Sequence, residues 1–476
     1  MPDTMRDRYR QCESTLGPRG QAHLLRWWPH LSDSQRRSLL AETEGIPWQV
    51  LDPVIATHVL QRPSRDLYTD LEPASVYSRI PVPENAALYE KAVEHGRMLL
   101  SRGKVAAFTV AGGQATRLGA DRPKGTVIVT PAGDQTLFEL FAQTIRAAGL
   151  RYQARIPWYI MTSPANHQQT LDFLTAHSFF GLPVQDVMLF PQGVLPAFDF
   201  RGRILLADKG HLALAPDGHG GSLAALVRSD ALGDMQRQGI EIISYFQVDN
   251  PLVKPFDPLF IGLHALTGSE MSTKVAAKVD DFERVGNVCL HKGKVTVIEY
   301  SDFPDEFARA KDARGRRTFD AGNLAIHLLN TAFVDRVVAH SFQMPLRRAE
   351  KVVPYLDESG VLQQPKSPNA VKLETFIFDA LPLANNPLVL EVDRVEEFSP
   401  VKNATGMDSL ETAKRDQSLR ACRWLEAADI QVPRKPDGSP DITIAISPLF
   451  ALDTEDVRAK KPKLPPLQAG MTIWLE

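Results

Sequence analysis

The first hundred residues have the hydrophobic pattern of helices. Four apolar residues between positions 21 and 31 fall at the spacing of one helix face: Leu24, Leu25, Trp28 and Leu31. Ser32 and Gln35 then have the spacing of a capping box, and Gly45 is expected to end the helix that this box begins. The pattern therefore predicts a helical N-terminal part over residues 1–100.

From residue 104 onward the pattern changes to alternating strands and helices. Residues 105–110 are a short continuous apolar run, which is typical of a buried parallel strand. Thr136 and Glu139 have capping-box spacing and predict the start of a helix that Gly149 is expected to end. A second strand is predicted at residues 157–161. This succession is a βαβ unit, and open α/β sheets bind ligands at the carboxyl ends of their strands, so the loop after the first strand is a candidate site.

Further strands are predicted later in the chain. Residues 242–248 form another buried apolar run, which leads directly into Asp249. Residues 294–300 have the pattern of an antiparallel hairpin strand, with Gly293 near the turn. After residue 410, a helix-like stretch and the strand 441–446 predict a small C-terminal part.

Composition and charge narrow the class of protein. The chain is 43% hydrophobic and 23% charged, as ordinary globular proteins are, and its 54 basic and 57 acidic residues give a net charge of −3. No basic excess indicates a nucleic-acid or membrane partner. The N-terminus lacks the apolar core of a signal peptide, and no segment has the roughly 18 unbroken apolar residues of a membrane span. Three cysteines without CxxC spacing indicate neither a disulfide framework nor a zinc site, so a cytoplasmic protein is expected.

The strongest chemical signal is the loop AGGQATRLGADRPKG, residues 111–125. Gly112 and Gly113 carry no side chain, so backbone N–H groups can approach a ligand closely. Arg117 and Lys124 lie seven residues apart and can converge on an anion, the first as a fork and the second as a point charge. The loop matches neither the Walker A nor the GxGxxG pattern. It indicates an anion or phosphate site, with an ordinary surface turn as the alternative.

The same loop resembles the signature of a known family. AGGQATRLG followed by PKG is similar to the LxxGGxGTRLGxxxPK signature of uridylyl-transferring pyrophosphorylases, and most similar to eukaryotic-type UDP-N-acetylhexosamine pyrophosphorylases, although Ala115 stands where glycine is usual. Other blocks similar to the family follow in the family's order: PWYIMTS (157–163), HSFFGL (177–182), FPQGVLPAFD (190–199), APDGHGG (215–221), FQVDNPLVKPFDPLFIG (246–262), ERVG (283–286), VIEYSD (297–302), AGNLAIH (321–327), PNAVKLETFIFD (368–379) and EFSPVKNATG (397–406). The resemblance covers nearly the whole chain.

This resemblance implies a fold and a reaction. It implies a Rossmann-like, GT-A-like α/β nucleotidyltransferase domain over residues 101–395, with a helical N-terminal subdomain (1–100) and a small α/β C-terminal lobe (396–476). The implied reaction converts UTP and a sugar 1-phosphate into a UDP-sugar and pyrophosphate, with UDP-N-acetylglucosamine or UDP-N-acetylgalactosamine as product. The attacking phosphate is already an anion, so this chemistry needs charge neutralisation and positioning rather than a nucleophilic side chain.

The resemblance also implies roles for single residues. The catalytic residues would be Arg117, Lys124 and Lys402. Asp249 would hold Mg²⁺, with Mn²⁺ as the alternative ion. The residues expected to bind the nucleotide are Ala111, Gly112, Gly113, Gln192, Gly218, His219 and Gly220, among which the glutamine would read the uracil edge. Those expected to bind the sugar are His219, Asn250, Gly286, Glu299, Asn323 and Phe378.

His219 is the main departure from the resembled family. N-acetylhexosamine enzymes usually have Asn in PDGNGG, whereas UDP-glucose and broad-range UDP-sugar pyrophosphorylases usually have His in a GHG motif. Between two glycines, the imidazole is expected to lie against the nucleotide or the sugar. A UDP-glucose, UDP-galactose or broad-range UDP-sugar pyrophosphorylase therefore stays open as an alternative. A non-catalytic nucleotide-sugar sensor is a second one, against which the joint presence of Arg117, Lys124, Asp249 and Lys402 argues.

Overall fold

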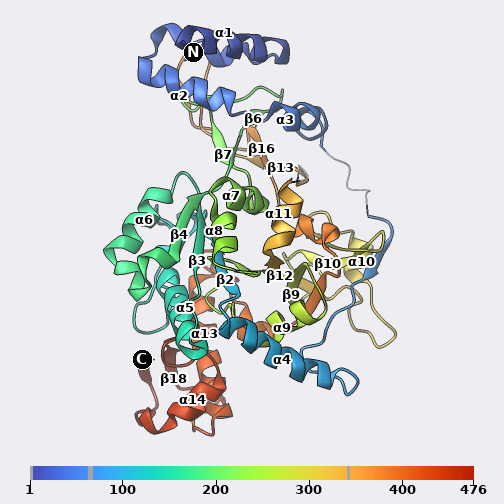
Figure 1. Cartoon of the computed structure of the whole chain (residues 1–476), viewed down its shortest axis with the longest axis vertical. Coiled ribbons are helices and arrows are strands. Elements are labelled where there is room, and N and C mark those ends of the chain that lie inside the picture. Colours follow the sequence, from blue (N-terminus) through green and yellow to red (C-terminus); the bar gives the residue numbers. More distant parts are fainter. Residues whose placement is uncertain (1–3, 63–67, 340–343) are drawn as a thin grey trace. The chain divides into compact units, whose positions relative to one another are not determined.

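The chain divides into two compact units (Figure 1). The computed structural model describes residues 4–62, 68–339 and 344–476. Within these ranges the first unit comprises residues 4–62, 192–222 and 344–379, and the second comprises residues 68–191, 223–339 and 380–476.

The first unit packs N-terminal helices against short antiparallel strands. Its helices are α1 (Met5–Leu16), α2 (Asp33–Glu44) and α3 (Trp48–Val54). Three of its strands form one antiparallel sheet in the order β13 (Arg347–Lys351), β16 (Ala370–Glu374) and β6 (Phe198–Asp199). Two further pairs are separate: β14 (Tyr355–Leu356) pairs with β15 (Leu362–Gln363), and β5 (Val194–Pro196) pairs with β7 (Leu214–Pro216). Buried helix residues such as Leu24 and Leu39 share a core with Phe198 and Val371 of the sheet.

The second unit is built on a ten-stranded mixed sheet, counted over the described residues. The order is β1 (Leu71–Pro73), β10 (Asn287–His291), β12 (Ala321–Asn330), β8 (Ile242–Gln247), β2 (Val105–Val110), β3 (Trp158–Thr162) and β4 (Val187–Pro191). Outside this path lie β9 (Met271–Ala277), β11 (Lys294–Ile298) and β17 (Leu388–Glu391). Strand β2 pairs in parallel with β3 and β8, so the carboxyl ends of these three strands lie at one edge of the sheet.

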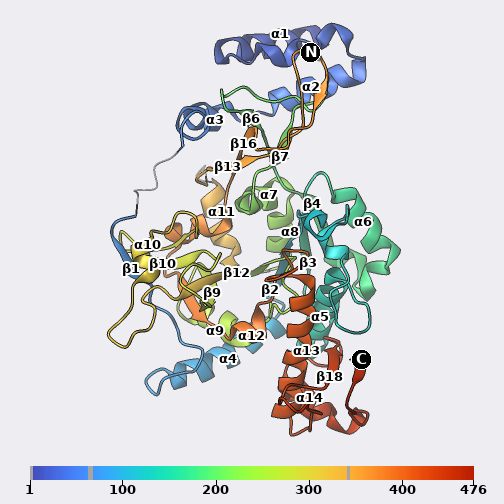
Figure 2. The same ribbon diagram turned by 180° about the vertical axis from the view of Figure 1, so that it is seen from behind.

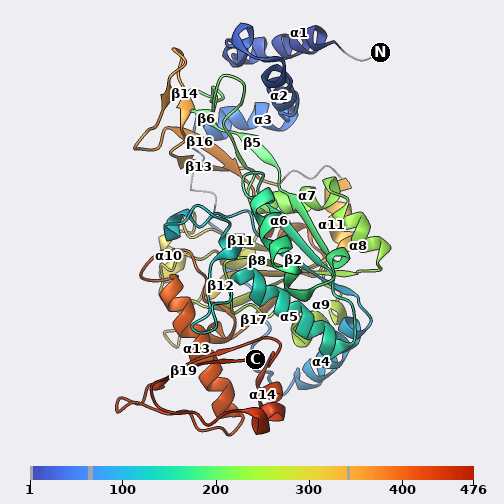
Figure 3. The same ribbon diagram turned by 90° about the vertical axis from the view of Figure 1, so that its left-hand side faces the viewer.

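Helices cover this sheet and form the C-terminal part of the second unit. They are α4 (Ala86–Ser101), α5 (Leu137–Tyr152), α6 (His167–Ala176), α7 (Ser222–Arg228), α8 (Ala231–Arg237), α9 (Pro258–Leu266), α10 (Asp305–Arg309), α11 (Thr331–Ala339), α12 (Arg394–Glu397), α13 (Leu410–Ala427) and α14 (Thr454–Lys460). Strands β18 (Ile442–Ile446) and β19 (Met471–Leu475) pair in parallel at the C-terminal end. Figures 2 and 3 show α5 alongside the parallel strands.

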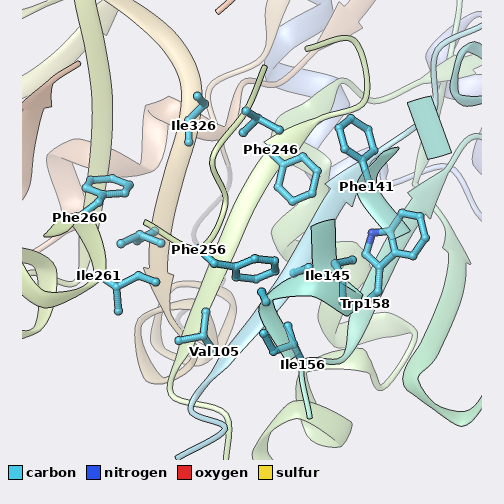
Figure 4. Packing of buried hydrophobic residues seen from close by; sticks show 14 of the residues in the cluster. Val105, Phe141, Ile145, Ile156, Trp158, Phe246, Phe256, Phe260, Ile261 and Ile326 are labelled. Carbon is cyan, nitrogen blue, oxygen red and sulfur yellow. The ribbon is translucent and has the colours of Figure 1, made fainter. Parts of the chain in front are cut away.

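The main core lies between these parallel strands and α5 (Figure 4). Val105, Trp158 and Phe246 come from neighbouring strands, and Phe141 and Ile145 come from the helix. The rings of Phe141 and Phe246 meet nearly edge to face, with centroids 5.2 Å apart. Burial on both faces explains why β2 is apolar at every position except Thr109, whose hydroxyl accepts the indole N–H of Trp158.

The structure confirms the predicted βαβ unit and hairpin. Strand β2 has the predicted bounds, and α5 begins after Thr136, whose hydroxyl accepts the backbone N–H of Glu139. The capping box of Ser32 and Gln35 is present at the start of α2. Gly293 is left-handed, with φ of +71°, at the β10–β11 turn.

Two predicted helix boundaries are wrong. The apolar residues near position 28 lie in two 3₁₀ turns (Ala22–Leu25 and Trp28–His30), because Pro29 has no N–H with which to continue a single α-helix. Helix α5 continues past Gly149 to Tyr152, which packs against the main core, and Gln153 takes the left-handed conformation that ends it.

The two units divide the chain differently from the three consecutive parts expected from the sequence. The first unit combines N-terminal helices with two later segments, because β16 pairs with β6 across a long stretch of sequence. The division at residues 100 and 395 stays a prediction. None of the helices in the described part of the chain combines the length and the apolarity of a membrane span.

Candidate functional site

The loop that follows β2 is folded back on itself at the carboxyl edge of the sheet. The carbonyl of Gly113 accepts the backbone N–H of Lys124 at 3.1 Å, which brings the two ends of the loop together. Asn166 is fully buried, and its side-chain amide donates to the carbonyls of Ala111 (3.0 Å) and Gly113 (3.4 Å). The Asn166 oxygen accepts the N–H of Ser163 at 2.8 Å. One buried amide thus fixes the start of the loop against the end of β3.

This geometry places Lys124 over the paired glycines. An added Cβ on Gly113 would lie 3.9 Å from Cε of Lys124, so the lysine stem runs alongside this glycine. Arg117 lies exposed in the 3₁₀ turn Thr116–Leu118, which Gly119 ends with φ of +77°. Gly125 has a packing role instead, since a Cβ there would lie 2.2 Å from the ring of Phe138.

Asp249 and Lys402 meet at the same edge although they are distant in sequence. Val110 of β2 pairs with Gln247 of β8, so the chain reaches Asp249 beside the start of the glycine loop. The backbone carbonyl of Asp249 accepts the N–H of Val401 at 2.8 Å. The ammonium of Lys402 lies 5.6 Å from the centre of the Phe398 ring and 3.8 Å from a carboxylate oxygen of Asp408.

Asn250 has a structural role that the sequence did not indicate. It is 4% exposed, and its amide donates to the carbonyl of Glu397 at 2.6 Å. Its side-chain oxygen accepts the N–H groups of Leu252 (3.2 Å) and Ser399 (3.1 Å). The side chain therefore anchors the segment that leads to Lys402, while its expected contact with a sugar stays a prediction.

Three of the expected sugar-binding residues lie together in the second unit. A Cβ on Gly286 would lie 3.3 Å from Oε1 of Glu299 and 3.8 Å from Cβ of Asn323. The carbonyl of Gly286 accepts the N–H of Asn323 at 2.8 Å. The Asn323 oxygen accepts Thr273 Oγ1 at 3.2 Å, which fixes the orientation of the amide. The carboxylate of Glu299 and the side chain of Asn323 thus lie beside Gly286, where β10 pairs with β12.

His219 belongs to the first unit and packs among aromatic rings. Its ring stacks on Phe376, with centroids 5.1 Å apart, and meets Phe378 at 5.7 Å. Its Nδ1 accepts the backbone N–H of Ile377 at 3.2 Å, which requires a ring without a proton on that nitrogen. Burial, with the nearby guanidinium of Arg347, lowers the pKa of His219 to about 4.

The glycines beside His219 serve the chain's own packing. A Cβ on Gly218 would lie 2.3 Å from the carbonyl oxygen of Thr375, and one on Gly220 would lie 2.6 Å from the Phe376 nitrogen. Both glycines were expected to bind the nucleotide, whereas the neighbour that the structure shows is the backbone after β16. Their expected contact with the nucleotide stays a prediction.

Gln192 and Phe378 also belong to the first unit. Gln192 directly follows β4 and is 7% exposed. Phe378 is 3% exposed and lies in the 3₁₀ segment Ile377–Leu383 rather than in a strand. The guanidinium of Arg347 lies 6.0 Å from the Phe378 ring centre and pairs with Asp379 at 2.7 Å. The uracil and sugar contacts expected of these two residues stay predictions.

Comparison with known families decides which family this is. Residues 69–415 match the model of a family described as "UTP--glucose-1-phosphate uridylyltransferase". The chain belongs to this family.

Individual members and solved structures agree. The human UDP-N-acetylhexosamine pyrophosphorylase-like protein 1 is 37% identical, over 92% of this chain and 91% of its own length. The UDP-N-acetylglucosamine pyrophosphorylase of Saccharomyces cerevisiae is 34% identical, over 86% of this chain and 89% of its own. The crystal structure of the corresponding Trypanosoma brucei enzyme matches with a TM-score of 0.83 at 26% identity, covering 100% of this chain and 99% of that one. The α/β nucleotidyltransferase fold expected from the sequence is therefore confirmed.

Two buried residues near the site of this family member were not predicted from the sequence. Asn166 lies three residues beyond the block 157–163 that resembles the family, so the resemblance did not include it. Lys274 is a fully buried lysine in β9, and the polar residues Ser272 and Thr273 directly before it conceal the buried strand in the sequence pattern.

The same edge offers few ligands for a metal ion. Within the described ranges, no group of three or more His, Cys, Asp and Glu side chains is placed to hold an ion. Asp249 alone is compatible with Mg²⁺, which keeps several waters and takes further oxygens from substrate phosphates. The donor set therefore fits Mg²⁺ bound together with a nucleotide rather than a preformed metal cage.

We expect His219 to stay neutral well below its usual pH range. Its folded-state pKa is about 4 against an ordinary value of about 6.5. The folded state therefore binds this proton less readily, so the stability contribution is complete above about pH 6.5 and is lost as the pH falls towards 4. Nuclear magnetic resonance of the imidazole should give a midpoint near 4 that is missing in His219→Asn. A midpoint near 6.5 would contradict the desolvation of the stacked ring.

Proposed function

We propose that this protein transfers the uridylyl group of UTP to an N-acetylhexosamine 1-phosphate, with N-acetylglucosamine 1-phosphate preferred. The products are the UDP-sugar and pyrophosphate. The observation that carries the proposal is the sheet edge at which the loop 111–125, Asp249 and Lys402 meet. The names of the relatives, most of which specify N-acetylglucosamine or N-acetylhexosamine, support this choice of sugar.

The proposed reaction is an in-line displacement at the α-phosphorus of UTP. An oxygen of the sugar phosphate forms the new P–O bond, and the bond to pyrophosphate breaks. The backbone amides at Gly112 and Gly113 would hold phosphate oxygens, while Arg117, Lys124 and Lys402 would neutralise the charge that develops. No proton has to leave the nucleophile, so the chain needs no general base for this step.

The Asp249 carboxylate would hold a Mg²⁺ ion at this edge. Such an ion, when bound, neutralises phosphate charge and orients the leaving group. We include Mn²⁺ as the alternative ion because both cations accept carboxylate, phosphate and water oxygens.

A cytoplasmic location is part of the proposal. Cys12, Cys289 and Cys422 are all free and buried. Unpaired cysteines are the usual state in a reducing compartment.

His219 favours a second candidate, a UDP-glucose, UDP-galactose or broad-range UDP-sugar pyrophosphorylase. An Asn side chain at this position would offer an amide donor, whereas the neutral ring of His219, whose Nδ1 accepts from Ile377, keeps a single donor at Nε2 and is stacked on Phe376. A neutral ring held by stacking is less suited than an Asn amide to donate a hydrogen bond to the acetamido group of a sugar. The choice between the candidates is therefore one of sugar selectivity and not of reaction type.

A substrate panel tests both candidates. Pyrophosphate release would be measured with UTP and Mg²⁺ and the 1-phosphates of N-acetylglucosamine, N-acetylgalactosamine, glucose and galactose, with ATP and GTP as alternative nucleotides. We expect the highest kcat/KM with UTP and N-acetylglucosamine 1-phosphate. A preference for glucose or galactose 1-phosphate would establish the second candidate. No release with any sugar would contradict uridylyl transfer.

Lys124→Ala provides the control for this panel. It removes a charge from a loop without touching the core, so we expect an intact fold. Turnover should fall about 10²- to 10³-fold, as when one preorganised donor to a developing charge is lost. The measurements are kcat and circular dichroism on the same preparation. A near-normal rate would exclude Lys124 from the phosphate site.

Asp249→Asn tests the metal proposal. A neutral amide binds Mg²⁺ more weakly than a carboxylate, so the Mg²⁺ concentration for half-maximal rate should rise at least about tenfold. The rate should recover in part at high Mg²⁺. Full activity of the unaltered enzyme in excess chelator, or an unchanged Mg²⁺ dependence in the variant, would show that Asp249 holds no metal.

A further inference from the structure

Lys274 is the centre of an ionic cluster that links the segment after Asp249 to the segment before Lys402. Lys274 of β9 is 0% exposed, and its ammonium lies 2.8 Å from an oxygen of Asp257 and 2.7 Å from an oxygen of Glu397. Burial acts to lower the pKa of Lys274, but the two carboxylates outweigh it and raise the pKa above its usual value. The lysine is therefore charged, and each partner is held by a charge-assisted hydrogen bond.

The two carboxylates come from segments that border the proposed site. Asp257 caps α9, where its side chain accepts the N–H of Leu259 at 3.0 Å, and it lies eight residues after Asp249. Glu397 is the last residue of α12 and lies five residues before Lys402. Lys274 thus joins the two chain segments that supply the expected metal ligand and the expected phosphate-binding lysine.

A series of hydrogen bonds continues from this cluster to Val401, the residue before Lys402. The carbonyl of Glu397 accepts the Asn250 amide at 2.6 Å, and the Asn250 oxygen accepts the N–H of Ser399 at 3.1 Å. The N–H of Val401 then donates to the carbonyl of Asp249 at 2.8 Å. Lys402 follows directly, so every second residue of this segment from 397 to 401 is fixed by a partner.

We propose that Lys274 is a positioning residue, which holds Glu397 and through it sets the place of Lys402 in the site. Removal of Lys274 would leave the buried carboxylate of Glu397 and the half-buried carboxylate of Asp257 without the cation that bonds to both. Relaxation of these charges towards water would displace the Glu397 end of the segment. A misplacement of about 1 Å at a charge-neutralising group can lower a rate about 10²-fold. The inference rests on the proposed function, because that function gives Lys402 its role.

Single substitutions measure the size of the effect. Lys274→Met should lower kcat at least about tenfold, with KM for the sugar 1-phosphate changed less than threefold. Glu397→Gln keeps the shape and the pairing of Lys274 with Asp257, and it should lower kcat about threefold to tenfold. Glu396→Gln is the matched control. Its carboxylate neighbours Glu397 on α12 but pairs with Lys254 and Arg423, so kcat should stay within about twofold.

A double-mutant cycle separates positioning from general support of the fold. If Lys274 acts through Lys402, adding Lys274→Met to Lys402→Ala should lower kcat by less than about twofold, since the group to be positioned is already absent. A further loss as large as in the unaltered background would overturn the proposal. So would a folded Lys274→Met variant with unchanged kcat. If Lys274→Met does not fold, Glu397→Gln takes its place in the cycle, and equal rates for Glu397→Gln and Glu396→Gln would overturn the proposal.

A binding measurement keeps this inference separate from the proposed function. The unaltered protein is assayed first, and an absence of pyrophosphate release would overturn the proposed function alone. The Kd for UTP is then measured by calorimetry for the same single and double variants. Here the proposal expects weaker binding in Lys274→Met but no additional weakening in the Lys402→Ala background. Equal weakening in both backgrounds would overturn it.

Discussion

The site depends first on the parallel pairing of β2 with its two neighbours. Val110 pairs with Met161 of β3 and with Gln247 of β8, so all three strands end at the same level. Parallel strands in a sheet covered on both faces carry their connections to one edge, and ligands bind there. Two features follow from this register. The glycine loop follows the end of β2, and Asp249 follows the end of β8. The strand pairing alone therefore brings the loop and Asp249 to the same edge.

Lys402 reaches this edge by a different means. It comes from a segment about 150 residues after Asp249, and backbone and ionic bonds of individual residues hold it there. Burying Lys274 with two carboxylates is costly, since each ion loses its water, and such clusters seldom add net stability compared with apolar packing. A function in positioning accounts for a cluster at this place better than a contribution to stability does.

The sequence predicted local elements well where the signal was itself local. The apolar run 105–110, the cap at Thr136 and the turn at Gly293 each depend on a few neighbouring residues, and all three are confirmed. The end of α5 was predicted wrongly because packing of Tyr152 on the core, a tertiary contact, extends the helix past Gly149. The family resemblance predicted the phosphate loop, Asp249 and Lys402 as site residues. The structure places all three at one edge of the sheet.

The roles of Asn250 and of the glycines beside His219 could not be found in this way. The amide of Asn250 is taken up by backbone groups of Glu397 and Ser399, which are almost 150 residues away. Gly218 and its neighbour Gly220 accommodate the backbone after β16, again from a distant segment. A sequence shows which groups a residue can offer, but the partners that use those groups are set by long-range folding.

The most direct test of the account is a crystal structure with UTP and Mg²⁺ bound. The account predicts that the triphosphate lies at the carboxyl edge of β2 and β8, with its oxygens on the amides of Gly112 and Gly113 and within hydrogen-bond distance of Lys124 and Lys402. It also predicts a metal ion on Asp249 that contacts the phosphates. A triphosphate bound away from this edge, with Lys124 and Lys402 facing solvent, would contradict the account.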